Sequence, residues 1–211
     1  MTNLVEQAFD TEEFYRALGA ERLEEYAVKT GLYNGIDNID ANILLSIVQY
    51  TCHSAHSVLE VGCGYGRIGQ LFIQHPEIKY WGIELHKPFV DSFKSKVQDK
   101  GTVLHGNFLD YPFPFKKIEC ILFPWSAIGE FSSNLGQISA LRRTRSLLLN
   151  GGRALFDIPR DVVNKFDGYE PGYFNIHEKY DLIAMELKYV TSHQYTTFTG
   201  RNREIIEISA K

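Results

Sequence analysis

The stretch VLEVGCGYGRIG, residues 58–69, decides the fold. It opens as an apolar run interrupted by one acid, Glu60, and continues into three evenly spaced glycines, Gly62, Gly64 and Gly66. Glycine adopts backbone conformations that a Cβ forbids, and it lets a ligand approach the main chain closely. The segment therefore predicts a buried strand, then a glycine loop that contacts a ligand, then a helix whose N-terminus favours anionic groups.

The spacing of the glycines separates two kinds of nucleotide-binding loop. A dinucleotide fingerprint reads GxGxxG, and its third glycine would fall where this chain has Arg67. The spacing here is GxGxG, with an acid two residues before the first glycine. Glu84 ends the next apolar run, about 20 residues further on, where an acid commonly binds a pair of ribose hydroxyls. We therefore expect Glu84 to bind a ribose.

Short apolar runs alternate with helical patterns from about residue 57 to 159. The apolar runs are SVLEV (57–61), YWGIE (80–84), TVLHG (102–106), IECILF (118–123) and RALFDI (153–158). The helical patterns between them are RIGQLFIQH, KPFVDSFKSKVQDK and LGQISALRRTRSLLLN, and Gly151-Gly152 is expected to cap the last helix. Buried strands joined by helices predict a parallel sheet with right-handed crossovers.

The two ends of the chain differ from this pattern. Residues 1–55 are expected to form helices around a turn at Tyr33, with Asn38 or Asp40 capping the second helix. Residues 161–211 are rich in aromatic side chains, and DLIAMELKYVTS and REIIEISA are expected to be antiparallel edge strands. The aromatic residues either pack the sheet edge or cover a pocket. The expected pocket liners are Tyr173, Phe174 and His177.

Composition limits the classes of function. The 211 residues suit one α/β domain, divided into a helical segment (1–55), a core (56–160) and C-terminal strands (161–211). A net charge of −4 gives no basic footprint for nucleic acid. Three widely spaced cysteines indicate neither disulfides nor a metal site. No signal peptide or membrane-spanning run is evident, so we expect a cytoplasmic protein. A homodimer is a further expectation.

Together these segments resemble the class I S-adenosylmethionine-dependent methyltransferases. E-x-G-x-G-x-G followed by GIEL resembles motif I and its successor, and LHGNFLDYPF (104–113) resembles the adenine-contacting segment. IECILFPWSAIGEF (118–131) and LRRTRSLLLNGGRALFDIP (141–159) resemble the fourth strand and the helix, turn and fifth strand. The resemblance implies a three-layer α/β sandwich whose seven-stranded sheet is mostly parallel, with order 3-2-1-4-5-7-6 and strand 7 antiparallel.

The resemblance also implies the cofactor, S-adenosyl-L-methionine, with S-adenosyl-L-homocysteine as its product. The predicted cofactor-binding residues are Tyr33, Glu60, Gly62, Cys63, Gly64, Gly66, Arg67, Glu84, Leu85, Asn107, Phe108, Phe123 and Trp125. Tyr33 and Arg67 are alternative partners for the methionyl carboxylate. Where Asn107 stands, the family more often has Asp.

The segment after the fourth apolar run indicates the acceptor class. Enzymes that methylate planar amides or adenine amines usually carry Asp/Asn-Pro-Pro-aromatic there, whereas this chain has Phe123-Pro124-Trp125-Ser126. FPWSAIGEF (123–131) is more similar to small-molecule methyltransferases, among them sugar N-methyltransferases. This predicts in-line methyl transfer to an N or O nucleophile of a small molecule. The alternatives are a protein or RNA methyltransferase and, less favoured, a dehydrogenase or non-catalytic binder.

A general base is needed only if the acceptor arrives protonated. Glu130, which closely follows the fourth apolar run, is the first candidate. His177 is the second predicted catalytic residue, and His193 and Asp157 are further candidates.

Overall fold

The computed structural model describes residues 11–51, 57–131, 133–160 and 187–211. The strands are β1 (Ser57–Val61), β2 (Lys79–Glu84), β3 (Thr102–His105), β4 (Ile118–Phe123), β5 (Leu148–Pro159), β6 (Leu187–Thr196) and β7 (Asn202–Ala210). The helices are α1 (Thr11–Lys29), α2 (Ile39–Thr51), α3 (Gly69–Phe72), α4 (Lys87–Val97), α5 (Asn134–Leu147) and the 3-10 helix η1 (Ala127–Glu130).

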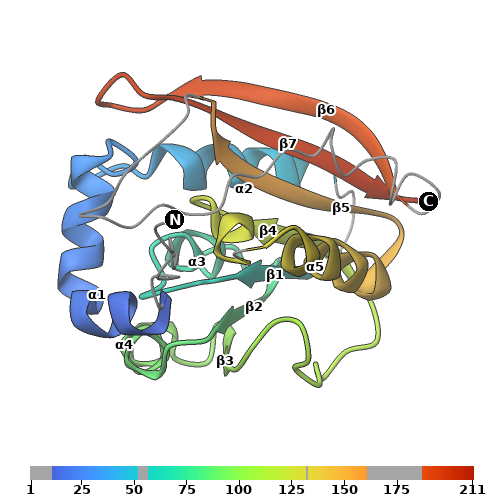
Figure 1. Cartoon of the computed structure of the whole chain (residues 1–211), viewed down its shortest axis with the longest axis horizontal. Coiled ribbons are helices and arrows are strands. Elements are labelled where there is room, and N and C mark those ends of the chain that lie inside the picture. The colour runs from blue at the N-terminus through green and yellow to red at the C-terminus, as the bar shows by residue number, and fades with distance from the viewer. Residues whose placement is uncertain (1–10, 52–56, 132, 161–186) are drawn as a thin grey trace, which may run out of the picture.

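All seven strands form one sheet in the order β3-β2-β1-β4-β5-β7-β6. Strands β1 to β5 pair in parallel, and β7 runs antiparallel to both β5 and β6. The predicted fold class, sheet order and antiparallel strand are confirmed. Figure 1 shows the sheet extending from β3 at the bottom to β6 at the top, with α1 upright at its left end.

Helices cover both faces of the sheet, which gives the predicted three layers. One face packs against α2, α3 and α4, and its buried residues include Leu44, Phe72 and Phe93. The other face packs against η1, α5 and the segment around Phe108 and Phe113. The central parallel strands β1, β2 and β4 are buried nearly throughout, because helices on both sides leave them no solvated face.

Two local predictions were wrong. The helix expected over RIGQLFIQH has only four helical residues, Gly69–Phe72, so it supplies little of the dipole expected beside the glycine loop. Gly151 and Gly152 do not cap α5, which ends at Leu147 and passes directly into β5. The two glycines lie inside β5, where its register with β4 shifts, and Gly151 has a φ of 77°.

The hairpin formed by β6 and β7 reaches back to the N-terminal helices. At its tip the Phe198 N–H donates to the Gly31 carbonyl at 2.8 Å, and the Thr199 hydroxyl donates to the Thr30 carbonyl at 2.9 Å. A Cβ on Gly31, whose φ is 74°, would overlap Thr199. The connection between α1 and α2 is therefore fixed by residues almost 170 positions later in the chain. Among the described helices, none is long and apolar enough to cross a membrane.

Candidate functional site

The three glycines after β1 serve two different purposes. All have positive φ: 70° at Gly62, 53° at Gly64 and 88° at Gly66. A Cβ on Gly66 would overlap the ring of Phe93, so this glycine allows α4 to pack against the loop. A Cβ on Gly62 or Gly64 would meet only one atom, at ordinary contact distance of 3.4 or 3.5 Å. These two positions need glycine for backbone conformation and for the space beside the loop.

Glu84, at the end of β2, is tied to the glycine loop. Its Oε2 accepts the Gly64 N–H at 2.9 Å, and its Oε1 accepts the His86 N–H at 2.8 Å. Burial raises the pKa of Glu84, and these backbone donors oppose that shift. A carboxylate has about four lone-pair sites, so the sites that these backbone donors leave open can accept from the predicted ribose hydroxyls.

The side chains of Glu60 and Cys63 are buried in the core and do not line the open side of the glycine loop. Glu60 is 1% exposed and accepts a hydrogen bond from the Tyr80 hydroxyl at 2.6 Å. Burial raises the pKa of Glu60 to about 8, although the Tyr80 hydrogen bond and Arg67 lower it. Cys63 is also buried, with its sulfur close to Gly82, and burial raises the pKa of its thiol. Both side chains therefore pack the glycine loop against β2.

Arg67 is engaged in a buried ion pair. Its two terminal nitrogens each donate to one oxygen of Asp40 at 2.6 Å, and one of them also donates to Asn38 at 3.1 Å. Burial alone would lower the pKa of Arg67, but the Asp40 charge and hydrogen bonds raise it. Tyr33 donates its hydroxyl to the Gly35 carbonyl, and it lines a polar hollow of about 380 Å³ together with Arg67. The two candidates for the methionyl carboxylate thus line the same hollow.

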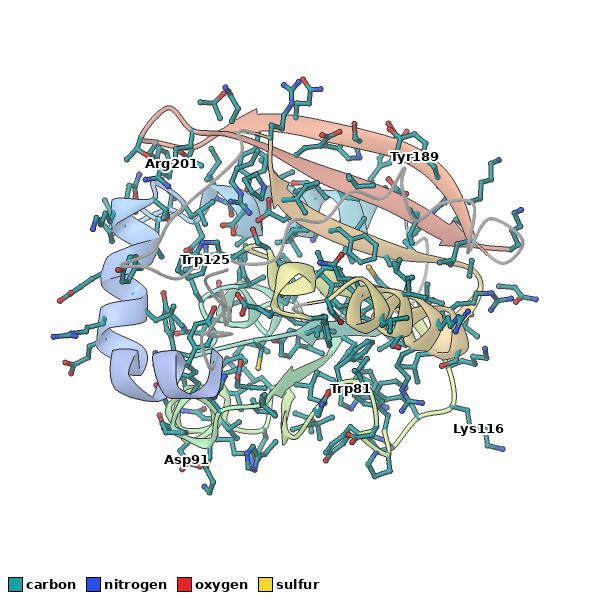
Figure 2. All side chains as sticks on the ribbon, in the orientation of Figure 1. Trp81, Asp91, Lys116, Trp125, Tyr189 and Arg201 are labelled. Carbon is teal, nitrogen blue, oxygen red and sulfur yellow. The ribbon has the colours of Figure 1, made fainter. Side chains whose placement is uncertain are left out.

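The chain turns sharply after β4, at Trp125 and Ser126. Their φ values are 45° and 65°, the left-handed region that costs a non-glycine residue about 1–2 kcal/mol. The Cβ of Ala127, just after the turn, would lie 3.4 Å from a Cβ placed on Gly62. The turn therefore faces the glycine loop. Figure 2 shows Trp125 on the α1 side of the molecule, well separated from Trp81.

Asp157, at the end of β5, binds this turn and carries no free carboxylate oxygen. It is 0% exposed, and its Oδ2 accepts the Trp125 N–H at 2.9 Å. Arg203 donates from Nε to Oδ1 and from an NH2 nitrogen to Oδ2, both at 3.0 Å, and Tyr195 donates to Oδ1 at 2.8 Å. A carboxylate so enclosed is unsuited to act as a general base, because no acceptor proton reaches it.

The predicted adenine contacts lie at the next strand ends. Phe108 is 3% exposed and packs edge-on against Phe123, with ring centroids 5.5 Å apart. Phe123 is fully buried and stacks on Phe156 at 4.8 Å, so its ring supports the site from inside the core. Asn107 is exposed and uses its side-chain oxygen to accept the Leu109 N–H. Leu85 is half exposed beside Glu84.

Tyr15 on α1 is a site residue that the sequence did not reveal. Its hydroxyl donates to Glu130 Oε1 at 2.9 Å, and its ring lies 5.2 Å from the His86 ring and 6.1 Å from the Phe89 ring. Tyr15 therefore connects η1 to the segment after β2. A lone tyrosine in a helical stretch carries no local signal for such a contact, which depends on the tertiary position of α1.

His193 is a further candidate base within the described residues. His193 lies on β6, with Nε2 3.4 Å from Glu207 on β7. His177, Tyr173 and Phe174 lie outside the described residues, so their predicted roles stay predictions. Within the described ranges, no three His, Cys, Asp or Glu side chains gather as a metal site.

Comparison with known proteins identifies the core. Residues 58–152, from β1 into β5, match the family model described as a methyltransferase domain. This stretch thus matches a methyltransferase domain, in agreement with the predicted class I S-adenosylmethionine-dependent methyltransferase. An uncharacterised methyltransferase from Geobacillus sp. strain WCH70 is 28% identical over 99 residues, which are 47% of this chain and 45% of that protein. The matched stretch thus spans less than half of this relative's length.

Solved methyltransferases share the whole fold at low sequence identity. A TehB-like S-adenosylmethionine-dependent methyltransferase from Corynebacterium glutamicum has a TM-score of 0.65 and 16% identity, covering 89% of this chain and 97% of its own. CalS10, an amino pentose methyltransferase from Micromonospora echinaspora with bound S-adenosylmethionine, has a TM-score of 0.64 and 12% identity, covering 88% and 96%. At these identities the likeness shows the fold alone.

The residues present fit the cofactor of the methyltransferase family. Glu84 stands at the end of β2 and its carboxylate has lone-pair sites left for hydroxyl donors. Gly62 and Gly64 leave space that side chains would fill, and the loop main chain is held in place by hydrogen bonds from the Gly62 and Cys63 N–H groups to the Ile83 carbonyl. Glu84 would hold the ribose, and the glycine loop would border the methionyl part.

Proposed function

We propose that this protein transfers a methyl group from S-adenosylmethionine to a nitrogen or oxygen atom of a small molecule. The observation that carries the proposal is the position of α1 over the carboxyl ends of β1 and β2. Leu23 of α1 is the nearest neighbour of the Gly64 position, and Tyr15 contacts both Glu130 and His86. A helix in this position restricts the acceptor to molecules that fit beneath it.

In this proposal each side chain of the site has its own role in methyl transfer. S-adenosylmethionine supplies an electrophilic methyl group on a sulfonium. Glu84 and the glycine loop orient the cofactor, which brings the two reactants together in one geometry. Glu130 accepts a proton from an acceptor that arrives as an ammonium or a hydroxyl, and the Tyr15 hydroxyl orients its carboxylate. His177 is the second proposed catalytic residue.

Two further features support a small acceptor. The net charge of −4 offers no electrostatic attraction to a nucleic-acid backbone. The structural relative CalS10 is described as an amino pentose methyltransferase. We extend to this chain the class of acceptor, a small polar molecule with an amine or hydroxyl group.

The test is a methyl-transfer assay with radiolabelled S-adenosylmethionine. Parallel reactions contain a set of small amines, amino sugars and hydroxyl compounds, a protein extract, or total RNA. We expect label in a small-molecule product, with Gly64→Val, which is expected to abolish cofactor binding, as the inactive control. Label found only in protein or RNA would overturn the proposal in favour of a macromolecular acceptor. Binding of NAD without binding of S-adenosylhomocysteine would overturn it altogether.

A further inference from the structure

Polar groups of two sheet residues, Asp157 on β5 and Arg203 on β7, hold the Trp125–Ser126 turn. Trp125 and Ser126 donate their successive backbone N–H groups to Asp157, one to the carboxylate and one to the carbonyl, both at 2.9 Å. The Ser126 hydroxyl accepts from Arg203 at 3.2 Å. Two adjacent residues with left-handed φ do not stay in that conformation unless their surroundings fix it. Asp157 and Arg203 are the groups that fix it here.

The Asp157–Arg203 pair is itself completed by Tyr195 from β6. The Tyr195 hydroxyl donates to Asp157 at 2.8 Å and accepts from the Arg203 Nε at 3.1 Å. Asp157 and Arg203 are 0% and 4% exposed, and every polar atom of the carboxylate is bonded. A buried ion pair adds little net stability compared with apolar packing, so stability alone is a poor reason for this arrangement.

A second buried ion pair, between Arg67 and Asp40, contacts the ring of Trp125. The Arg67 guanidinium lies over the Trp125 ring, 5.4 Å from its centroid, and Asp40 binds that guanidinium through both oxygens. Trp125 is thus fixed at its backbone by Asp157 and at its ring by Arg67. Trp125 as a whole residue is half-buried, so it lies at the border of the core.

We propose that Asp157, Arg203 and Tyr195 are positioning residues for methyl transfer. They fix the Trp125–Ser126 turn so that the indole forms one wall of the acceptor site, where an aromatic face attracts a cationic amine. Strands β6 and β7, which lie beyond the cofactor-binding strands, thereby determine how the acceptor is oriented. This inference rests on the proposed small-molecule methyl transfer.

The matched variants are Asp157→Asn and Glu207→Gln. Glu207 is a buried acid on β7 that pairs with Arg153 at 3.1 Å and His193 at 3.4 Å, and neither partner contacts the turn. We expect both variants to lower the melting temperature. Only Asp157→Asn is expected to lower acceptor kcat/KM, by roughly 10- to 100-fold, the effect of a displaced reactant. Affinity for S-adenosylhomocysteine is expected to fall less than acceptor kcat/KM, because Glu84 and the glycine loop are untouched although Trp125 borders the predicted cofactor site.

A spectroscopic readout tests the turn without relying on activity. The chain has two tryptophans, Trp81 and Trp125, so in a Trp81→Phe background the tryptophan bands of the near-ultraviolet circular dichroism, and the fluorescence excited beyond tyrosine absorption, are specific for Trp125. In this background Asp157→Asn is expected to change both signals, and Glu207→Gln is expected to leave them as they are. Tyr195→Phe, which removes one hydrogen bond and keeps the ring, is expected to act in the same direction with smaller amplitude.

The outcomes are separable. If Asp157→Asn and Tyr195→Phe lower only the melting temperature, as Glu207→Gln does, the network is structural and the inference is overturned. If Asp157→Asn does not fold, Tyr195→Phe alone decides by the same criteria. If the parent protein methylates no small molecule, the proposed function fails, while the Trp125 signals still show whether the network fixes the turn.

Discussion

The Glu84 carboxylate accepts the backbone N–H of Gly64 at 2.9 Å, which ties the end of β2 to the glycine loop after β1. The acid predicted to bind a ribose therefore also holds the loop that borders the cofactor. One side chain connects the two parts of the site before any ligand binds. Removing it is expected to affect cofactor binding in two ways, through lost contacts and through a loosened loop.

Glu84→Ala is expected to weaken S-adenosylhomocysteine binding by about 1.5–3 kcal/mol, the range for hydrogen bonds to a charged group. Titration calorimetry measures the change. Glu84→Gln is the control, because its amide oxygen keeps one acceptor while the charge is lost. We expect an intermediate affinity for it. Equal affinities for the parent and Glu84→Ala would show that the ribose is bound elsewhere.

Gly64→Ala and Gly66→Ala form a matched pair, since both place a Cβ at positive φ. Gly66→Ala is expected to lower the melting temperature more, because its methyl group overlaps Phe93. Gly64→Val is expected to abolish cofactor binding while the fold is retained, because its side chain occupies the space beside the loop. Thermal melts and S-adenosylhomocysteine titrations distinguish these effects. A Gly64→Val protein that binds normally would place the ligand away from this glycine.

Glu60 is expected to make stability depend on pH. Burial raises its pKa to about 8, so the folded state keeps a proton that the unfolded state releases above about pH 4.5. The stability contributed by this group is therefore complete below about pH 4.5 and is lost as the pH rises through about 8. Glu60→Gln retains an acceptor for Tyr80 and cannot ionise, so its stability relative to the parent should increase over this interval. Urea unfolding at several pH values tests this, and parallel curves would refute it.

Arg67→Ala is expected to destabilise the fold by about 3–5 kcal/mol, because it leaves the Asp40 carboxylate buried without its partner. Tyr33→Phe is expected to leave the melting temperature nearly unchanged, since it loses only a hydrogen bond at an exposed turn. The two affinities for S-adenosylhomocysteine then show which residue, if either, binds the methionyl carboxylate. An Arg67→Ala protein as stable as the parent would contradict the structural role of this ion pair.

Glu130→Gln is expected to lower kcat by about 10²–10⁴-fold for an acceptor that arrives protonated, the usual contribution of a general base. The defect should shrink at high pH, where the acceptor is already deprotonated in solution. Tyr15→Phe removes the hydrogen bond to Glu130 and is expected to cause a smaller loss. Steady-state rates across a pH series provide the measurement. A Glu130→Gln rate equal to that of the parent at every pH would exclude this base.

Local patterns were sufficient to predict that the glycine loop and Glu84 come together. Gly62, Gly64 and Glu84 lie in short segments whose strand ends meet at one edge of a parallel sheet, so their proximity follows from the fold class. The predicted strand bounds of β1 and β4 agree with the structure for the same reason. Buried parallel strands appear in the sequence as unbroken apolar runs between turns.

The contacts around Glu130 and around the Trp125–Ser126 turn cannot be read from sequence spacing. Tyr15 meets Glu130 across 115 residues, and Asp157 meets Arg203 across 46. Asp157 looked like a possible base because an acid at a strand end is often exposed, but burial among four donors gives it another role. Gly151-Gly152 resembled a helix cap because the same residue type serves both a cap and an irregular strand.

The hydrogen bonds from Phe198 and Thr199 to Gly31 and Thr30 have a consequence for biosynthesis. The turn that carries α1 over the site is anchored by a hairpin tip almost 170 residues later in the chain. During translation α1 and α2 emerge before the parallel strands β1 to β5, but their anchor emerges after these strands. The glycine loop and Glu84 can come together on the nascent chain, whereas the cover over them is completed only after the ribosome has released the hairpin. A nascent chain stalled before residue 198 is thus expected to contain the parts of an open cofactor edge without a closed acceptor site.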